Sequence, residues 1–583
     1  MRKKWKVYES ISKKERSKFP EIDPLLLQLL FNRGLKNPPD IEQFLSPDYQ
    51  NDLHDPMTMP GVKAAVERIL LAIEKKQKVL VYGDYDADGV CSSALMVLSL
   101  KAFGIKPGIY IPYRDTEGYG MNERAVLEIA NQGYNLVITV DCGIANYNEV
   151  EILKKRGVET IITDHHNPVH TIPDSLAVVN PKLEQKKMYK NQELSGTAVA
   201  FKLIAALLSS EMRKKWPNIT FPHEGFEKWL LDLVAISLVT DVCQLTGENR
   251  TLMKYGLLVL SKTQRKGLLS LARESRIDLN SVTAQTIGFQ IGPRLNAAGR
   301  MDHASTSYQL LVTEDESEAI NLSSLLNEKN RERQALTEQI FKEVLEQTDK
   351  QKEDPVFIVK KSDWQTGLVG LVAGKISDKY YKPTIVIGKN LDGNWVGSGR
   401  SIPEIDITEA LKVNSKYLSH FGGHAQACGF TLKKEKDFDG FKKGVMLFMA
   451  DKLKGIVLTP KITVDVEIEL KDVNWSLVDG IEKFKPFGPG NPVPSFISRK
   501  VIVNNVVAVG QNNNHLKIDF KARDGTIKRT IAFQCDNESR WGKNWVENLK
   551  LGDEVDIVFE IQINEWNGNR EIQLTINDMK LSD

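Results

Sequence analysis

Val79-Leu80-Val81-Tyr82-Gly83-Asp84-Tyr85-Asp86-Ala87-Asp88-Gly89-Val90 is an apolar run of strand length followed by three aspartates at every second position. Because side chains of an extended chain alternate between its two faces, a continued strand would project Asp84, Asp86 and Asp88 from one side. Three like charges on one face repel each other unless cations neutralise them. The stretch therefore predicts either a metal site or a solvated acidic turn. A calcium loop is disfavoured, because its twelfth position, counted from Asp84, is Leu95 instead of glutamate.

The composition is that of an ordinary protein with large buried cores, since 41% of its 583 residues are hydrophobic and 26% are charged. This length favours three or four domains. The formal net charge of +2 means that any nucleic-acid surface must be a local patch. The first twenty residues form one, with eight Lys or Arg against two Glu, and are either a disordered solubilising tail or a contact with phosphate.

The five cysteines lie far apart and form no CxxC pair, which favours a reducing compartment and argues against disulfides or a thiolate zinc site. The basic N-terminus has no apolar signal core, and we find no uninterrupted apolar stretch of about 18 residues. We therefore expect a cytoplasmic protein that does not enter a membrane.

After a helical segment over residues 21–78, strands and helices alternate. This order predicts a parallel sheet covered by helices on both faces, and ligands of such sheets bind beyond the carboxyl ends of the strands. The expected strands are 79–82, 108–111, 136–140 and 159–163, and the expected helices include 92–100, 123–131 and 229–240.

The residues that follow these elements carry metal-binding groups, namely Asp141-Cys142-Gly143, Asp164-His165-His166 and Asp241. Carboxylates and imidazoles without thiolates suit Mn²⁺, Mg²⁺ or Zn²⁺, and a set this rich can bridge two ions that activate water in phosphoester hydrolysis. Each group also has a simpler interpretation. Asp141 can be a helix N-cap, Asp164 can orient His165, and Asp241 can end its helix by chance.

Together these motifs resemble the DHH phosphoesterase superfamily and, in detail, its RecJ branch of single-strand-specific exonucleases, from about residue 20 to the C-terminus. The resemblance implies two divalent ions, with Mn²⁺ preferred or Mg²⁺ in its place. Their ligands would be Asp86, Asp88, Asp141, His165 and Asp241. By the same resemblance Asp84 is a catalytic residue, either a ligand or a group beside one. His166 would face the scissile phosphate, or else orient a ligand.

Further segments match parts of the family that hold the nucleic acid. Arg114 can fork onto a phosphate and Tyr119 can stack on a base, and the resemblance places their loop at the 5′ end of the strand. The segment 195–198 is either a capped helix start or a source of backbone amides for an anion. Residues 292–301 are too rich in Gly and Ala for a simple helix, and the resemblance places Arg294 at the duplex edge.

The rest of the chain predicts a helix over 315–349 that joins two domains, a second α/β unit from Pro355, and a β-rich end after Pro486-Phe487-Gly488-Pro489-Gly490-Asn491-Pro492. In the second unit Ser398, Arg400 and His424 would bind phosphate oxygens. Gln365 stands where many relatives have histidine, which puts a role for imidazole there in question. Five short strands between 501 and 576 suit an OB-fold or another small barrel.

The expected fold class is therefore α/β, with a parallel-sheet DHH domain joined by a long helix to a smaller α/β domain and followed by a β-barrel. The expected parts are an N-terminal helical extension (1–75), the DHH catalytic domain (76–310), the connecting helix (311–350), the DHH-associated substrate-binding domain (351–455), and a linker with the OB-fold (456–583).

The resemblance implies an exonuclease that degrades single-stranded DNA from the 5′ end to 5′-mononucleotides in DNA repair and recombination. The implied partners are single-stranded DNA, a single-stranded-DNA-binding protein and a recombination helicase, and we expect a monomer. One alternative is a smaller-substrate DHH phosphodiesterase acting on short oligoribonucleotides or cyclic dinucleotides, which would not need the extra domains. The other is a non-catalytic strand-binding scaffold, which would have broken metal motifs.

Overall fold

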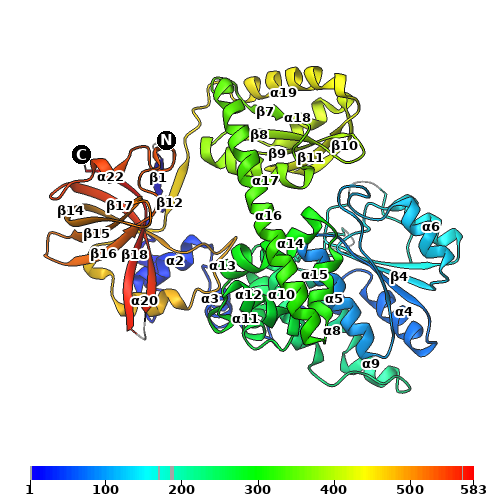
Figure 1. The fold of residues 1–583 in the computed structure, drawn as a ribbon. Coiled ribbons are helices and arrows are strands. Elements are labelled where there is room, and N and C mark those ends of the chain that lie inside the picture. The colour runs from blue at the N-terminus through cyan, green and yellow to red at the C-terminus, as the bar shows by residue number, and fades with distance from the viewer. Residues whose placement is uncertain (1–2, 169–170, 184–188, 567–568, 583) are drawn as a thin grey trace.

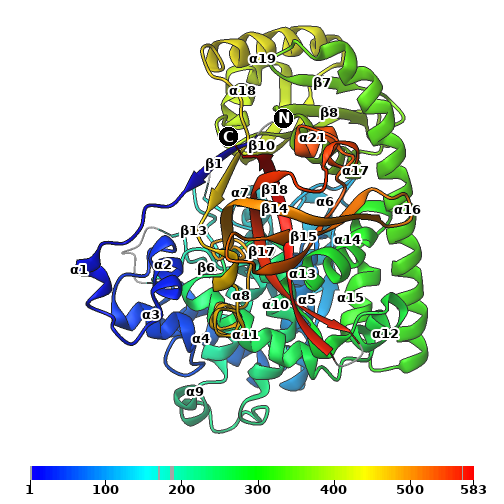
Figure 2. The ribbon, with the colours of Figure 1, turned by 90° about the vertical axis from the view of Figure 1, so that its left-hand side faces the viewer.

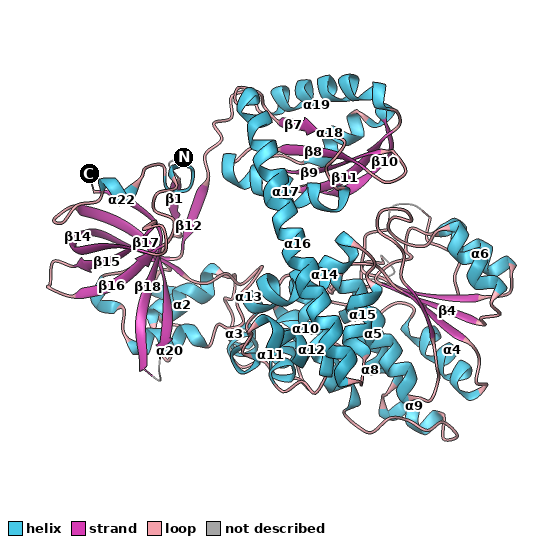
Figure 3. Ribbon diagram, in the orientation of Figure 1, coloured by secondary structure: helices cyan, strands magenta, loops and turns pink. Residues whose placement is uncertain are grey.

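The computed structural model describes residues 3–168, 171–183, 189–566 and 569–582. It consists of three units, which we call the first unit (residues 56–315), the second unit (354–454) and the barrel unit (461–582) (Figures 1 and 3). In Figure 1 the helix α16 (Glu316–Thr348) rises from the first unit into the second, and the barrel unit lies to the left of both. The predicted α/β class is confirmed.

The first unit contains a parallel five-stranded sheet in the order β3-β2-β4-β5-β6. Its strands are β2 (Val79–Tyr82), β3 (Gly108–Tyr110), β4 (Leu136–Val140), β5 (Glu159–Thr163) and β6 (Ala177–Val179). The sequence predicted the first four. The strand β6 was missed.

Both faces of this sheet are covered. Along β2, Val79 and Val81 join one hydrophobic core while Leu80 and Tyr82 join another, because successive side chains point to opposite faces. The first core is shared with α4 (Val62–Glu74), α5 (Ala87–Ala102) and α8 (Gly196–Leu207), and the second with α6 (Glu123–Asn131) and α7 (Tyr147–Lys155). The carboxyl edge of the sheet is therefore left for the loops that carry the acidic motifs.

The remaining helices of the first unit are η1 (Pro56–Thr58), α9 (Ser210–Lys215), η2 (Phe226–Leu230), α10 (Leu231–Thr240), α11 (Gly247–Ser261), α12 (Lys266–Ser275), η3 (Leu279–Ser281), α13 (Ala284–Thr286), η4 (Ile287–Ile291), α14 (Gly292–Met301) and α15 (Ser305–Val312). The prediction that 292–301 is not a simple helix was wrong. Pro293 stands in the first turn, where its missing N–H is tolerated, and a π-helical turn leads into α14. In the described ranges, each helix is too short or too polar to cross a lipid bilayer.

The second unit has a five-stranded sheet in the order β10-β11-β9-β8-β7, in which only β7 and β8 run parallel. The short helix η5 (Asp349–Gln351) follows α16 and precedes this unit. The elements of the unit are β7 (Phe357–Lys360), α17 (Thr366–Tyr380), β8 (Thr384–Lys389), β9 (Trp395–Arg400), α18 (Ile407–Val413), η6 (Ser415–Tyr417), β10 (Leu418–His424), β11 (Ala427–Leu432), η7 (Glu435–Asp437) and α19 (Phe438–Lys452).

The barrel unit is a closed five-stranded barrel, because β14 pairs with both β15 and β17. Its elements are β12 (Lys461–Val464), β13 (Val466–Glu467), η8 (Leu470–Asp472), α20 (Trp475–Glu482), β14 (Ser495–Val509), β15 (His515–Lys521), β16 (Ile527–Ala532), α21 (Glu538–Trp541), α22 (Trp545–Asn548), β17 (Glu554–Trp566) and β18 (Asn569–Leu581). This architecture agrees with the predicted OB-fold.

The N-terminal segment packs against the barrel unit. Its elements are β1 (Lys4–Val7), α1 (Lys13–Arg16), α2 (Pro24–Asn32) and α3 (Pro38–Leu45). Strand β1 pairs in parallel with β12, and the Trp5 indole donates to Asp578 (2.7 Å). The interpretation of the first twenty residues as a disordered tail is therefore wrong for Lys4–Val7. Figure 2 shows the blue N-terminal chain running from β1 to α1, α2 and α3 on the left of the view.

Arg250, on α11, ties the first unit to the chain that enters the barrel. Its guanidinium is 1% exposed and donates to five backbone carbonyls, those of Phe44, Lys483, Phe484, Lys485 and Pro486. The Cζ atom of Arg250 also lies 3.9 Å from the centre of the Phe44 ring. One side chain thus joins the first unit, the N-terminal segment and the linker.

We expect Arg250→Leu to destabilise the protein strongly, because a buried acceptor left without its donor costs about 1–3 kcal/mol. Urea unfolding should show a lower midpoint for the first transition. Arg523→Leu, at an exposed position of the barrel unit, is the control and should change the midpoint little. Equal midpoints for the two variants would contradict the role of Arg250.

Candidate metal centre

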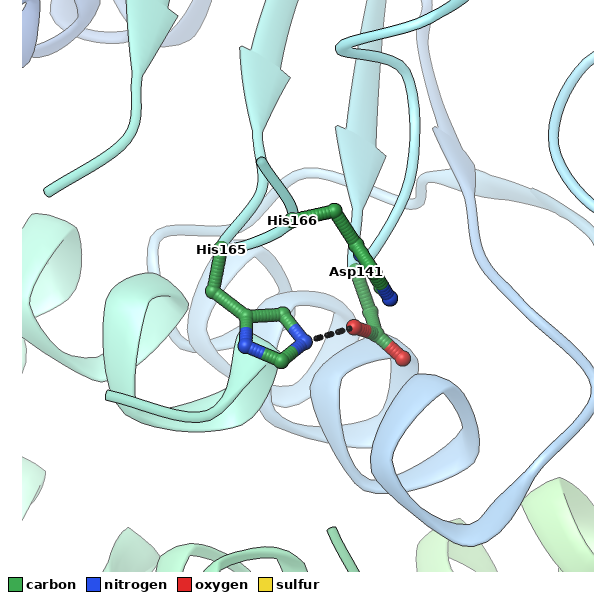
Figure 4. Close-up of side chains that lie close together, drawn as sticks. All are labelled: Asp141, His165 and His166. Atoms are coloured by element: carbon green, nitrogen blue, oxygen red, sulfur yellow. Dashed lines mark ion pairs between the residues drawn. The ribbon is translucent and has the colours of Figure 1, made fainter. Parts of the chain in front are cut away.

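The acidic motifs meet at the carboxyl edge of the first sheet. Asp84 follows β2, Asp141 follows β4, His165 and His166 follow β5, and Asp241 ends α10. The His165 Nε2 and Asp141 Oδ1 atoms are 3.2 Å apart (Figure 4), and His165 Nδ1 lies 3.7 Å from Asp241 Oδ2. Elements far apart in the sequence therefore deliver their side chains to one place.

The alternation suggested a strand that continues through the three aspartates. The chain does not continue in this way. Asp86 is instead the N-cap of α5, and its Oδ1 atom accepts from the backbone N–H groups of Asp88 and Gly89. Asp88 consequently lies in the first helical turn. A Cβ atom at Gly89 would lie 2.6 Å from the Asp84 backbone, so glycine is needed where the turn folds onto the helix.

Asp88 is held by the start of α8. Its carboxylate accepts from the N–H groups of Gly196 (2.7 Å) and Thr197 (2.8 Å), and from the hydroxyls of Thr197 (2.7 Å) and Ser237 (2.6 Å). The anion at this helix start is thus an internal carboxylate, which the sequence could not identify. Such bonds fix the direction of a carboxylate before any ligand arrives.

Asp141 is confined by its backbone and by α8. Its φ angle of 61° is in the left-handed region, which few residues other than glycine adopt. A Cβ atom at Gly196 would lie 2.4 Å from Asp141 Oδ1, so only glycine leaves room for this carboxylate. A strained backbone beside a buried charge is typical of functional sites.

These residues fit a divalent metal centre. Three groups have ligand atoms within 4.8 Å of one another: Asp84, Asp86 and Asp141; Asp88, His165 and Asp241; and Asp141, His165 and His166. Moreover, three buried atoms form no hydrogen bond in the described part of the chain, namely Asp84 Oδ1, Asp141 Oδ1 and His165 Nε2. Buried polar atoms are rarely left unsatisfied, and carboxylate with imidazole suits Mn²⁺ or Mg²⁺.

The electrostatics of the site also indicate that it needs a bound cation. Burial and mutual repulsion raise the pKa values of Asp84, Asp86 and Asp141, and they raise the pKa of Asp241 to about 8. Burial also lowers the pKa of His165 to about 4, so this imidazole is neutral and able to ligate. A site that disfavours charged carboxylates in the absence of a cation is a site that a cation stabilises.

His166 has a different environment. Its Nδ1 atom lies 2.8 Å from Asp164 Oδ1 and 2.8 Å from the Tyr119 hydroxyl. Burial lowers the pKa of His166, but the hydrogen bond and charge of Asp164 outweigh it and raise the pKa to about 9. His166 is therefore an imidazolium at neutral pH, with Nε2 left to donate elsewhere.

Asp164 is a positioning residue. Its Oδ2 atom accepts from the Ile144 N–H, and Oδ1 accepts from the N–H groups of His165 and His166 as well as from the His166 ring. Burial raises the pKa of Asp164, but the hydrogen bonds and charge of His166 more than offset this and lower it overall. It therefore stays ionised and orients both histidines. The sequence offered this interpretation for Asp164 only in relation to His165.

Four arginines gather near the carboxylates without forming an ion pair in the described residues: Arg114, Arg300, Arg333 and Arg400. Burial and the charges of the other three lower the pKa of Arg300 to about 9, and Arg333 Nε is buried without a partner. Arg114 lies over the Tyr85 ring (5.0 Å). Clustered guanidinium groups without carboxylates form a surface for phosphate. The sequence predicted Arg114 and Arg400 but missed Arg300 and Arg333, which only the packing of α14 and α16 brings here.

The other predicted substrate residues are less close together. Arg400 donates to Ser398 Oγ (3.2 Å) on β9, and both side chains lie beside Gly370. Arg294 bonds to Asn327 of α16 (3.1 Å). Tyr119 is 44% exposed. His424, at the end of β10, is exposed, and its side chain forms no hydrogen bond or ion pair with the described residues.

We expect Mn²⁺ to raise the melting temperature of the protein, since a ligand at one hundred times its Kd stabilises by about 2.7 kcal/mol. Asp141→Asn should gain much less from Mn²⁺. In metal-free buffer it should melt above the wild type, because one repelling buried charge is removed. Asp392→Asn, at an exposed turn, should behave like the wild type. A full Mn²⁺ shift in Asp141→Asn would contradict this metal centre.

Comparison with known families matches three segments: "DHH family, N-terminal domain" over residues 78–238, "DHHA1 domain" over 353–451, and "RecJ OB domain" over 464–578. The single-stranded-DNA-specific exonuclease RecJ of Bacillus subtilis is 36% identical over 564 residues, which cover 96% of this chain and 68% of the relative. The RecJ of Haemophilus influenzae is 31% identical, with 95% and 96% covered.

Comparison with solved structures also finds RecJ proteins. The crystal structure of RecJ from Thermus thermophilus in complex with Mn²⁺ is 27% identical and superimposes with a TM-score of 0.83, covering all of this chain and 80% of that one. A manganese-bound exonuclease RecJ is 33% identical with a TM-score of 0.58, covering 69% of this chain and 98% of that one. From its fold, its site and these relatives, the chain belongs to the RecJ family of single-stranded-DNA-specific exonucleases.

Proposed function

We propose that this protein hydrolyses single-stranded DNA from the 5′ end and releases 5′-mononucleotides, in DNA repair and recombination. The observation that carries the proposal is the cluster of buried carboxylates and a neutral imidazole, with unsatisfied ligand atoms, beside arginines that have no acidic partner in the described residues. The activity named for the relatives and the Mn²⁺ and Mg²⁺ complexes of RecJ support it.

Two divalent ions, Mn²⁺ by preference or Mg²⁺, would be held by Asp86, Asp88, Asp141, His165 and Asp241, with Asp84 beside them. Bound there, they would supply the activation of water and the neutralisation of charge on phosphoryl oxygens. Asp88 is directed by α8 and Asp141 by its left-handed backbone, so these carboxylates need little rearrangement on binding. His166, kept protonated by Asp164, would donate from Nε2 to an oxygen of the scissile phosphate.

The polarity follows from a proposed site for the terminal 5′ phosphate. Arg114 and Arg400 come from different units but lie close enough for the charge of Arg114 to lower the pKa of Arg400, after the larger effect of burial. With Ser398 they would surround a dianionic phosphate, and this would set the first phosphodiester over the metals. The ring of Tyr119, an exposed residue, would stack on a terminal base.

The rest of the strand would follow α14 and α16, where Arg294, Arg300 and Arg333 lie, with His424 across from them on the second unit, and would reach the barrel. We also propose a monomeric state, a cytoplasmic location and the five-part division of the chain at residues 75, 310, 350 and 455, although α4 packs in the core of the first unit. The proposed protein partners are a single-stranded-DNA-binding protein and a recombination helicase.

Asp141→Ala should abolish hydrolysis of a long single strand while binding of that strand stays within about threefold, because the arginines and the barrel remain. Release of mononucleotides from strands labelled at either end, with and without a 5′ block, would measure activity and polarity together. Full Mn²⁺-dependent hydrolysis by Asp141→Ala would refute the metal assignment. Faster hydrolysis of dinucleotides than of long strands would favour the smaller-substrate alternative.

Arg400→Ala should reduce the preference for a 5′-phosphorylated strand over a 5′-hydroxyl strand about tenfold, since a charge-assisted hydrogen bond is worth roughly 1.5–3 kcal/mol. The ratio of kcat/KM for the two strands measures this. Lys412→Ala, exposed on α18, removes a cation from the same unit and should leave the ratio unchanged. An unchanged ratio in Arg400→Ala would place the 5′ phosphate elsewhere.

A further inference from the structure

Residues 486–492, which we call the linker hairpin, form a closed turn between α20 and β14. The Gly488 N–H donates to the Asn491 carbonyl (2.9 Å), and the Asn491 N–H donates back (3.0 Å). The Asn491 side chain is fully buried and donates to the carbonyls of Phe484 and Pro486. These hydrogen bonds close the turn, although it contains no candidate metal ligand and no barrel strand.

The linker hairpin is anchored from two directions. Arg250 of the first unit donates to the carbonyl of Pro486, along with the three residues before it. From α2, Arg33 donates through Nε to Asn491 Oδ1 (2.8 Å) and through Nη2 to the Pro492 carbonyl (2.7 Å). The linker hairpin is therefore hydrogen-bonded to the first unit through Arg250 and to the N-terminal segment through Arg33.

The tip of the linker hairpin packs against the loop that follows Asp241. The Leu245 N–H donates to the Pro489 carbonyl (2.7 Å). A Cβ atom at Gly488 would lie 2.5 Å from Leu245 Cδ1, and one at Gly490 would lie 2.4 Å from Gln244 Oε1. Gly488 does not have a positive φ angle, so it is glycine for reasons of space. A methyl group added at Gly488 would therefore push on the buried Leu245 side chain.

The loop needs such support. Asp241 is the C-cap of α10, and the next residue, Val242, has a φ angle of 57°, which β-branched residues disfavour. The Val242 side chain is 67% exposed, so its own packing cannot hold that conformation. The fixed points of the loop include the Cys243 N–H, which donates to the Leu238 carbonyl (2.9 Å), the Gln244 carbonyl, which accepts from Asn249 Nδ2 (3.1 Å), and the fully buried Leu245 under the hairpin.

We infer that the linker hairpin positions Asp241 for metal binding, so that Gly488 and Leu245 are positioning residues of the metal centre. Arg250 and Arg33 hold the linker hairpin in place. The hairpin in turn holds the loop that begins at Asp241. The inference rests on the proposed function in one respect, since Asp241 is taken there as a metal ligand.

The test is direct Mn²⁺ binding to the full chain, followed by the electron paramagnetic resonance of free Mn²⁺. Gly488→Ala should raise the Kd for Mn²⁺ about tenfold, as changes to groups that orient ligands commonly do. Its KM for single-stranded DNA should stay near the wild-type value. Lys483→Ala, an exposed side chain in the same linker, should leave the Kd unchanged. An unchanged Kd in folded Gly488→Ala would overturn the inference.

A second variant separates positioning from general damage. Leu245→Ala shortens the side chain that the linker hairpin holds, and should raise the Kd for Mn²⁺ as Gly488→Ala does, while the KM for single-stranded DNA stays near the wild-type value. An unchanged Kd in folded Leu245→Ala would overturn the inference. If Gly488→Ala does not fold, Leu245→Val replaces it, and an unchanged Kd there would overturn the inference equally. Tight Mn²⁺ binding by a wild type that does not degrade DNA would refute the proposed function instead.

Discussion

Mutual repulsion among buried carboxylates is the constraint on which this structure depends. Six aspartates lie at the carboxyl edge of one parallel sheet, and burial with mutual repulsion raises the pKa of four of them, namely Asp84, Asp86, Asp141 and Asp241. In a medium of low dielectric constant such charges are unfavourable unless cations compensate them. The surrounding fold supplies what a metal centre needs: helix N–H groups and hydroxyls on Asp88, an ionised Asp164 behind both histidines, and glycines where a Cβ atom would displace a ligand.

The three units relate to this centre in different ways. The first unit supplies every candidate ligand, the second brings Arg400 and Ser398 opposite Arg114, and the barrel unit is joined through a linker that touches the loop after Asp241. Arg250 and α16 are the main connections. Since charge on the arginines has no carboxylate partner in the described residues, the region between the units is suited to a phosphate backbone.

Much of the site was predictable because it follows strand ends. A buried strand followed by Asp, as at β2 and β4, places that residue at the sheet edge whatever the rest of the chain does. The extended stretch expected through Asp84, Asp86 and Asp88 ends at Asp86, because Asp86 caps α5 and a capping hydrogen bond outweighs a period-two pattern of only five residues. The helix α14 was misjudged, because its two glycines and its proline lower its intrinsic helix propensity but its buried neighbours stabilise it, and because alanine in fact favours a helix.

The sequence by itself determined the fold class, the parallel sheet, the long connecting helix and the barrel, because each depends on local periodicity. It also indicated metal-binding groups at the ends of strands and of one helix, from which the resemblance to the DHH phosphoesterases selected Asp86, Asp88, Asp141, His165 and Asp241. Only the tertiary structure decided which atoms lack partners, why Gly196 must be glycine, that Arg300 and Arg333 lie beside the carboxylates, and that the linker hairpin meets the Asp241 loop. These are contacts between residues tens to hundreds of positions apart, and they arise when separately formed elements pack, which no local pattern records.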